Sequence, residues 1–456
     1  MQRFKHAAKR GPALLIWMLA ALLLAGCENE TGSTPLGGGE DDAHDHEEHG
    51  DHPGRLAILS RDGAGDQLYA YDLEEQAQLP GSLALNHAPS ALYPSPGTRF
   101  VLAMQRSANQ VQIIDGGLYR HDDHVDEVAP GLVGTLTGPR PTHYRVHGEQ
   151  AALFYDGDAG SALMAQVQVL TDHSLESASM EADHTFASAH HGVAEPRGEI
   201  VLATHRTAAS GLPEKVDILH QHGDHYHGEG TISLDCPDLH GAGSNEEYSV
   251  FGCSDGILIV HQDGETFTAQ HVDNATLGMA AGERVGSFDS HHELPQFVAY
   301  ADDRILIIPP DHGDAEELDW TEGAPVALDG HARDGHGEHL ILLDGSGVLR
   351  IIDTPDWSEH APVENAIDPE TAAPPASGHG SRVSMAVGGE PAQVFLSHAD
   401  SQSIIVVDVE TGTLATPLNL TFTPGQLTWV GLSSEEGEHE HEEDDHDHDD
   451  EHDHDH

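Results

Sequence analysis

The stretch HLILLDGSGVLRIIDT, residues 339–354, holds two short apolar runs on either side of an Asp-Gly turn. Runs of this length that are rich in Leu, Ile and Val and flank a turn are typical of a β-hairpin. The unit returns as FVLAMQRSANQVQIIDGG, residues 100–117, and in six further places. The eight hairpin tips are expected near Asp62, Ala108, Asp158, Gly211, Asp255, Asp302, Gly345 and Asp400.

The hairpins repeat every 43 to 55 residues, which is the period of a four-stranded propeller blade. Room remains between hairpins for an outer strand and for the next inner strand. GQLTWVGL, residues 425–432, has an inner-strand pattern with no hairpin after it, while the first hairpin has no inner strand before it. We therefore predict an all-β fold, an eight-bladed β-propeller over residues 54–434, in which the last strand completes the first blade and leaves no free sheet edge. Seven blades is the alternative, with one hairpin as a decoration.

Acidic residues dominate the composition: 79 Asp and Glu stand against 19 Lys and Arg, with 38 His, for a formal net charge of −60. Nucleic acid is excluded as a partner because phosphate binding depends on basic patches. A saline habitat and a field that concentrates cations both explain such acidity.

The N-terminus reads as an export signal. A basic start is followed by an apolar run from Ala13 to Ala25 and by LAGC, which resembles a bacterial lipobox with Cys27 as the lipidated residue. A plain secretory signal cut nearby is the alternative. We expect residues 1–27 to be the signal and residues 28–53 to begin as a flexible tether. The mature protein would be periplasmic and held at a membrane by its lipid.

The two remaining cysteines, Cys236 and Cys253, flank sixteen residues. Because exported thiols tend to pair, we predict a disulfide between them, whose closure is worth roughly 3 kcal/mol on a chain-entropy estimate. A metal site made of Cys236, His240 and Cys253 is the alternative.

Both ends of the mature chain alternate histidine with carboxylate, in EDDAHDHEEHGDH (residues 40–52) and EHEHEEDDHDHDDEHDHDH (residues 438–456). Solvation explains the acids but not the histidines, and imidazole with carboxylate is a metal-binding combination. We expect both segments, including a disordered tail at residues 435–456, to capture metal. The capture histidines are His44, His46, His49, His52, His439, His441, His446, His448, His452, His454 and His456.

Histidines also recur in step with the blades, each expected just before an inner strand. They are His87, His143, His190, His240, His291, His331 and His379, with doublets at His190-His191 and His291-His292. Loops that enter the inner strand open beside the central channel, so these side chains are predicted to gather at one mouth. A hydrogen-bonding surface role explains any one of them singly.

Two loop clusters, RHDDH with His121 and His124, and HQHGDHYH with His220, His222, His225 and His227, each follow the third strand of a blade. They are expected on the face opposite that mouth. Their spacing suits chelation, with Asp as a ligand or as the acceptor that orients imidazole. Polar surface loops are the alternative for both.

Several motifs carry a family resemblance over most of residues 55–409. They are IIDGGLYRHDDHVDE (113–127), TGPRPTHYRVHGEQAALFYDG (137–157), AHHGVAEPRGEIVLATH (189–205), CPDLHGAGSNEEYSVFGCSDGIL (236–258) and DGHGEHLILLDGSGVLRIID (334–353). In these the chain resembles the periplasmic zinc metallochaperone family AztD, which has a β-propeller fold and is encoded with zinc ABC transporters. The pairing of CPDLHG with FGCSDG is the most specific piece.

The resemblance implies Zn²⁺ carriage, handover to the solute-binding protein of a zinc ABC transporter, and a His-rich mature N-terminus. This chain departs from the family in a sparser His/Asp run after DGG, in its lipobox and in its long C-terminal tail. The candidate folded-site ligands are His121, His124, His143, His190, His191, His240, His331 and His379.

Zinc also fits the ligand chemistry, because histidine and carboxylate without Met clusters or spare thiols disfavour Cu(I), and so many histidines exceed what Mg²⁺ or Ca²⁺ requires. Nickel and Cu(II) remain open. We expect carriage rather than catalysis, with a metal-dependent propeller enzyme and a metal-buffering interaction scaffold as the alternatives.

Overall fold

The structure is a computed structural model that describes residues 52–121, 124–280, 282–321, 323–360, 362–368 and 383–432. The predicted signal, the lipidation site Cys27, most of the N-terminal capture segment and the C-terminal tail lie outside these residues, as does His379. No helix in the described ranges has both the length and the apolarity to cross a membrane.

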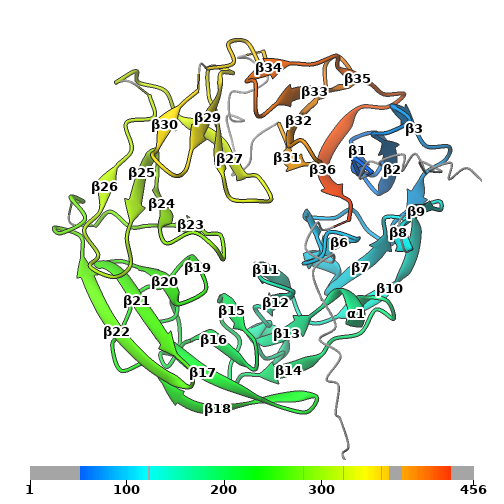
Figure 1. Cartoon of the computed structure of the whole chain (residues 1–456). Coiled ribbons are helices and arrows are strands. Elements are labelled where there is room, and N and C mark those ends of the chain that lie inside the picture. The colour runs from blue at the N-terminus through cyan, green and yellow to red at the C-terminus, as the bar shows by residue number, and fades with distance from the viewer. Residues whose placement is uncertain are drawn as a thin grey trace, which may run out of the picture. The chain divides into compact units, whose positions relative to one another are not determined.

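The described strands form eight blades arranged around a common axis, which confirms the predicted propeller and its blade count (Figure 1). From inner to outer strand, blade 1 contains β36 (Pro424–Val430), β1 (Arg55–Ser60), β2 (Gln67–Asp72), β3 (Ala77–Gln78) and β4 (Leu83–Ala84). Blade 2 contains β5 (Ala91–Pro94), β6 (Phe100–Gln105), β7 (Gln110–Asp115) and β10 (Gly131–Thr137). Blade 3 contains β11 (Pro141–His147), β12 (Gln150–Tyr155), β13 (Gln166–Leu170) and β14 (Ala182–Thr185), and blade 4 contains β15 (Ala194–Arg197), β16 (Ile200–His205), β17 (Lys215–His222) and β18 (His225–Thr231).

Blades 5 to 8 follow the same plan. Blade 5 contains β19 (Ala242–Ser244), β20 (Tyr248–Cys253), β21 (Gly256–Asp263) and β22 (Thr266–Asp273). Blade 6 contains β23 (Ser287–Asp289), β24 (Phe297–Ala301), β25 (Arg304–Ile308) and β26 (Glu316–Glu317). Blade 7 contains β27 (Leu328–Arg333), β28 (His339–Asp344), β29 (Leu349–Asp353) and β30 (Ser358–Glu359), and blade 8 contains β31 (Met385–Gly388), β32 (Gln393–His398), β33 (Ser403–Asp408), β34 (Thr413–Leu414) and β35 (Leu418–Asn419).

Short elements decorate this frame: the hairpin of β8 (Leu118–His121) and β9 (His124–Glu127), the helix α1 (Asp172–Leu175), and the 3-10 turns η1 (Arg106–Ala108) and η2 (Ala159–Ser161). All eight predicted hairpins are confirmed as the second and third strands of the blades.

The ring closes where the sequence predicts. β36 pairs antiparallel with β1, in a register that sets Arg55 opposite Val430 and Ala57 opposite Thr428. A buried apolar cluster containing Leu56 and Phe395 packs blade 8 against blade 1, and similar clusters lie between the other neighbouring blades. Blades sandwiched in this way need apolar side chains on both faces, which is why strands such as β6 read as continuous apolar runs.

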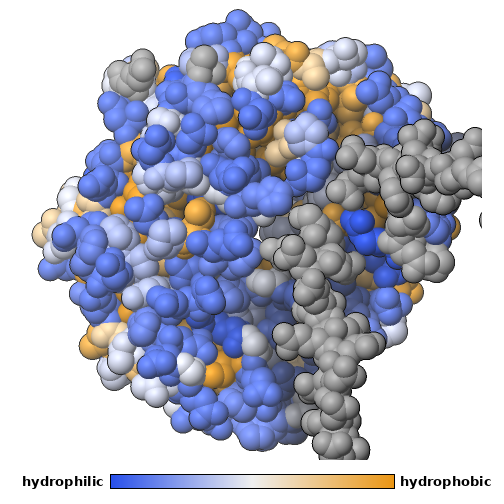
Figure 2. Space-filling view, viewed as in Figure 1, coloured by the Kyte–Doolittle hydropathy of each residue, from blue (hydrophilic) through white to orange (hydrophobic). Residues whose placement is uncertain are grey.

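Antiparallel pairing within each blade defines two faces of the propeller. The entrance face is the side on which inner strands begin and to which the hairpins between second and third strands return. The exit face carries the loops that lead from the third strand to the outer strand. Figure 2 shows that the viewed face is mostly hydrophilic, with hydrophobic residues in separate patches.

Candidate metal centre

Three histidines from consecutive blades meet at the entrance face. His143 lies on β11 of blade 3, His191 precedes β15 of blade 4, and His240 precedes β19 of blade 5. Ring centroids are 4.7 Å apart for His143 and His191, 5.4 Å for His191 and His240, and 5.8 Å for His143 and His240. One ring nitrogen from each lies within 4.8 Å of the other two. We call these three residues the mouth cluster.

Each ring of the mouth cluster is oriented through its Nδ1 atom. The acceptors are Gly192 O at 2.6 Å for His143, Asp156 Oδ2 at 3.0 Å for His191, and Gly286 O at 2.9 Å for His240. A carbonyl or carboxylate oxygen can only accept, so each Nδ1 carries the proton of its neutral ring. The lone pair is therefore left on all three Nε2 atoms, as it is in metal-ligating histidines.

The spacing of the mouth cluster fits a zinc-sized ion. With Zn–N bonds of about 2.0 to 2.1 Å, the ligand atoms of a tetrahedral site lie about 3.3 Å apart. One nitrogen from each ring lies within 4.8 Å of the other two, so these nitrogens need to approach by no more than about 1.5 Å to reach that spacing. Three protein ligands leave a fourth position for water or for an incoming group.

A buried carboxylate supports the cluster from behind. Asp156, at the end of the second strand of blade 3, also accepts from Arg106 Nη2 at 2.6 Å. Burial raises the pKa of Asp156, but hydrogen bonds and charge from His191 and Arg106 outweigh it and leave that pKa below its usual value. Asp156 therefore stays ionised and holds the imidazole of His191 in its ligating tautomer.

Burial disfavours the charged form of two rings in the mouth cluster. Burial, with smaller contributions from the neighbouring His191 and His240, lowers the pKa of His143 to about 4. Burial is also the largest cause of the lowered pKa of His240, followed by the charges of His191 and Arg284. Both rings are thus neutral near pH 7 and ready to donate their lone pairs.

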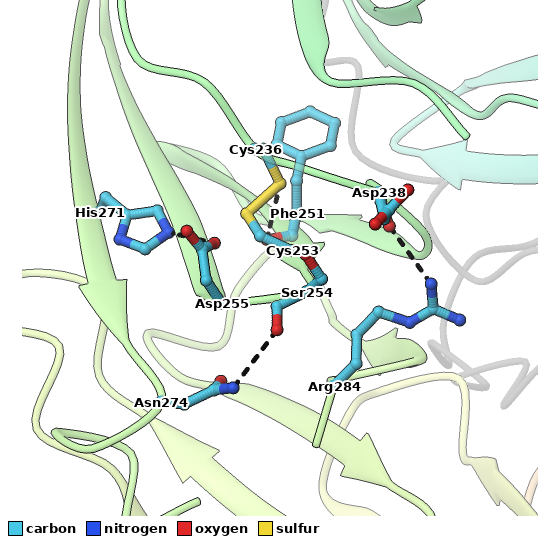
Figure 3. The surroundings of a disulfide bond; sticks show 9 residues. All are labelled: Cys236, Asp238, Phe251, Cys253, Ser254, Asp255, His271, Asn274 and Arg284. Carbon is cyan, nitrogen blue, oxygen red and sulfur yellow. Dashed lines mark hydrogen bonds and ion pairs between the residues drawn. A yellow bond between two sulfur atoms is a disulfide. The ribbon is translucent and has the colours of Figure 1, made fainter. Parts of the chain in front are cut away.

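The loop that carries His240 is fixed by the disulfide between Cys236 and Cys253, which confirms the predicted pairing (Figure 3). Cys253 ends β20, so the bridge ties the loop to the second strand of blade 5. Arg284 donates to Asp238 O at 3.2 Å in the same loop. The alternative site of Cys236, His240 and Cys253 is therefore wrong, because a disulfide leaves no thiolate to bind metal.

His190 is not part of the mouth cluster, although it neighbours His191. Its side chain is 3% exposed, lies between Phe154 and Phe186, and bonds to Thr204 O through Nε2 at 2.9 Å. Both ring nitrogens face carbonyl oxygens, since Nδ1 bonds to Ser188 O. Residue 190 thus packs between blades 3 and 4 while residue 191 faces the mouth.

The predicted position just before an inner strand is wrong for His291 and His331, as it is for His143. His291 follows β23 instead of preceding it, because that inner strand is short, and its Nε2 bonds to Gly335 O at 3.0 Å. His331 lies within β27 and stacks on Tyr300 with ring centroids 3.9 Å apart. His87 does precede an inner strand, β5.

The remaining candidates lie elsewhere. His121 and His124 pair across the β8–β9 hairpin, and the side chain of His121 lies outside the described residues. His52 is docked rather than mobile: its side chain is 3% exposed, with Nε2 3.3 Å from Glu74 and 3.7 Å from Glu127. The prediction that His52 belongs to the mobile capture segment is therefore wrong, because blade 1 and the β8–β9 hairpin enclose its imidazole.

Sequence reasoning missed Asp156 and Arg106. Both belong to hairpins in which Asp-Gly or polar residues indicated only a turn. Their position in the repeat could have identified them, because the hairpins between second and third strands return to the same face as the mouth cluster.

Two solved structures of AztD from Citrobacter koseri share this fold. The apo form is 20% identical to this chain and a further crystal structure is 21% identical, each with a TM-score of 0.67 over 83% of this chain and 98% of AztD. Dihydro-heme d1 dehydrogenase NirN is 13% identical, with a TM-score of 0.50 over 83% of this chain and 75% of that protein. No protein-family model matches the sequence. The expected likeness to AztD is thus confirmed for the fold.

Proposed function

We propose that this protein is a periplasmic zinc metallochaperone that holds Zn²⁺ at the mouth cluster and passes it to the solute-binding protein of a zinc ABC transporter. The observation that carries the proposal is the convergence of three imidazoles, each presenting Nε2 because an acceptor fixes its Nδ1. Such a site selects a borderline metal ion by its ligand type.

Three ligands with an open fourth position suit a carrier. An acceptor histidine or carboxylate can bind the ion before the first donor leaves, so metal passes by ligand exchange without release into water.

The rest of the chain supplies metal to this site. A formal net charge of −60 attracts divalent cations. The alternating His and acid segments at residues 40–51 and 435–456 capture ions, and a lipid on Cys27 keeps the protein at the membrane where the transporter operates.

A zinc enzyme is the second candidate, because three histidines with an open position also describe catalytic zinc sites. In the described residues, however, the carboxylate nearest the cluster is already engaged by His191 and Arg106. Carriage therefore fits the site better than general-base catalysis.

A transfer assay tests the proposal. Zinc-loaded protein is mixed with the apo solute-binding protein in the presence of a chelator that traps free zinc. We expect His143→Ala with His240→Ala to abolish loading, while a matched control, His173→Ala with His312→Ala, loads at the parental rate because these are exposed side chains away from the cluster. Parental loading by the first variant refutes the proposal, and turnover of a hydrolytic substrate favours the enzyme.

A further inference from the structure

A second group of imidazoles lies on the exit face, on the ribbon formed by β17 and β18. Cross-strand partners are His220 with His227 and His222 with His225. Directly opposed residues point to the same side of a sheet, as do residues two apart along one strand. All four histidines therefore project from one face of this ribbon, which we call the histidine ribbon.

The opposite face of the ribbon is anchored in the core. Leu219 and Tyr226, which alternate with the histidines, are 1% and 3% exposed and pack in the cluster between blades 3 and 4. The ribbon also joins blade 3 through parallel pairing of Asp183 with His225, and His184 Nδ1 bonds to Tyr226 O at 2.9 Å. The four imidazoles are thus displayed on a fixed backbone.

The rings already contact one another. Centroid distances are 5.3 Å for His220 and His222, 5.2 Å for His222 and His227, and 4.5 Å for His225 and His227. The Nε2 atoms of His225 and His227 are 2.8 Å apart. A metal ion bound by both would hold them about 3.3 Å apart, so little rearrangement is needed.

One ring is oriented by a carboxylate. His225 Nδ1 bonds to Asp224 Oδ1 at 3.0 Å, which leaves its Nε2 with the lone pair. His227 therefore donates its Nε2 proton to that lone pair in the metal-free protein, and must move this proton to Nδ1 when an ion takes its place. Glu229 adds a carboxylate beside His220 and His222, with ligand atoms of the three within 4.8 Å.

We propose that the histidine ribbon binds one divalent transition-metal ion of the zinc class through His220, His222, His225 and His227. Imidazole nitrogens without thiolate select such ions over Mg²⁺ and Ca²⁺. The site is separate from the mouth cluster because it lies at the exit end of blade 4, and it does not depend on the proposed carriage. Its side chains are largely exposed, so the ion exchanges readily with solution.

Histidine footprinting on the full chain tests this site. Diethyl pyrocarbonate acylates free imidazole nitrogens, and mass spectrometry reads each residue separately, so ions bound by other segments do not interfere. With Zn²⁺ as the probe, we expect acylation of His222, His225 and His227 to slow at least fivefold. His173, whose side chain is 90% exposed, serves as an internal reference and should react at the same rate with and without metal.

Variants separate a shared ion from incidental shielding. In His222→Ala with His227→Ala, His225 should regain its metal-free reactivity in the presence of Zn²⁺, whereas Gln221→Ala on the opposite face should leave the protection intact. His143→Ala with His191→Ala should also leave it intact, which keeps this test distinct from that of the mouth cluster. Equal reactivity of the ribbon with and without Zn²⁺, or continued protection of His225 in the double variant, overturns the proposal.

Discussion

Replacing Asp156 with Asn should weaken zinc binding at the mouth cluster without removing any ligand. The carboxylate accepts from His191 Nδ1 at 3.0 Å and from Arg106 Nη2 at 2.6 Å. An amide keeps the size of the side chain but loses the charge that raises the basicity of His191. Losing such a supporting group costs about 10- to 100-fold in metal affinity, which is about 1.4 to 2.7 kcal/mol.

The variant should also lose some stability. Asp156 Oδ1 is buried without a hydrogen-bond partner in the described part of the chain. An Asn amide turned to that side would bury an unsatisfied donor, at a cost of about 1 to 3 kcal/mol in the free energy of unfolding. Affinity must therefore be measured on protein shown to be folded.

Competition titration against a zinc dye resolves the tightest class of sites in the full chain. Asp158→Asn is the matched control, because Asp158 belongs to the same hairpin but caps η2 by accepting from Gly160 N at 3.0 Å. We expect only Asp156→Asn to weaken the tightest class. Affinity within twofold of the parent, or equal losses in both variants, would refute the supporting role of Asp156.

Three further outcomes are expected. Deleting residues 40–51 and 435–456 should lower the number of zinc ions bound but keep the tightest class in a competition titration, since segments that the sequence predicts to be disordered would lose conformational entropy on binding. On acidification, histidines with the reference pKa of about 6.5 become protonated first, whereas burial lowers the pKa of His143 to about 4. Zinc should therefore leave the two end segments between pH 7 and pH 5 while the tightest class persists, and loss of that class at pH 6 in a metal-release titration would contradict the assignment. His190→Ala should lower the free energy of unfolding in denaturant by about 2 to 4 kcal/mol through a buried cavity and the loss of a buried hydrogen bond, whereas His191→Ala should change zinc affinity with little effect on unfolding.

The propeller could be predicted from the sequence because its signal is repeated. A hairpin such as residues 339–354 is locally ambiguous, but its return at a blade period, together with an unpaired last strand, leaves few closed topologies. The disulfide followed from export and from there being only two candidate cysteines. Each of these inferences rests on spacing along the chain, which the structure preserves.

The site was only partly predictable because its ligands lie in loops. Neither strand alternation nor helical periodicity decides which of His190 and His191 turns toward the core, and packing of Phe154 and Phe186 around His190 settles it. His291 was misplaced because the end of an inner strand of three residues cannot be located from its pattern. Asp156 was not singled out, since its partner Arg106 comes from another blade.

The central claim is that one Zn²⁺ is bound by His143, His191 and His240. Diffraction from zinc-loaded crystals, recorded on both sides of the zinc absorption edge, locates the metal directly. We predict the strongest anomalous peak at about 2.0 to 2.1 Å from the Nε2 atoms of all three residues. A mouth cluster without a peak while zinc occupies other sites, such as the hairpin of His121 and His124, would contradict the account.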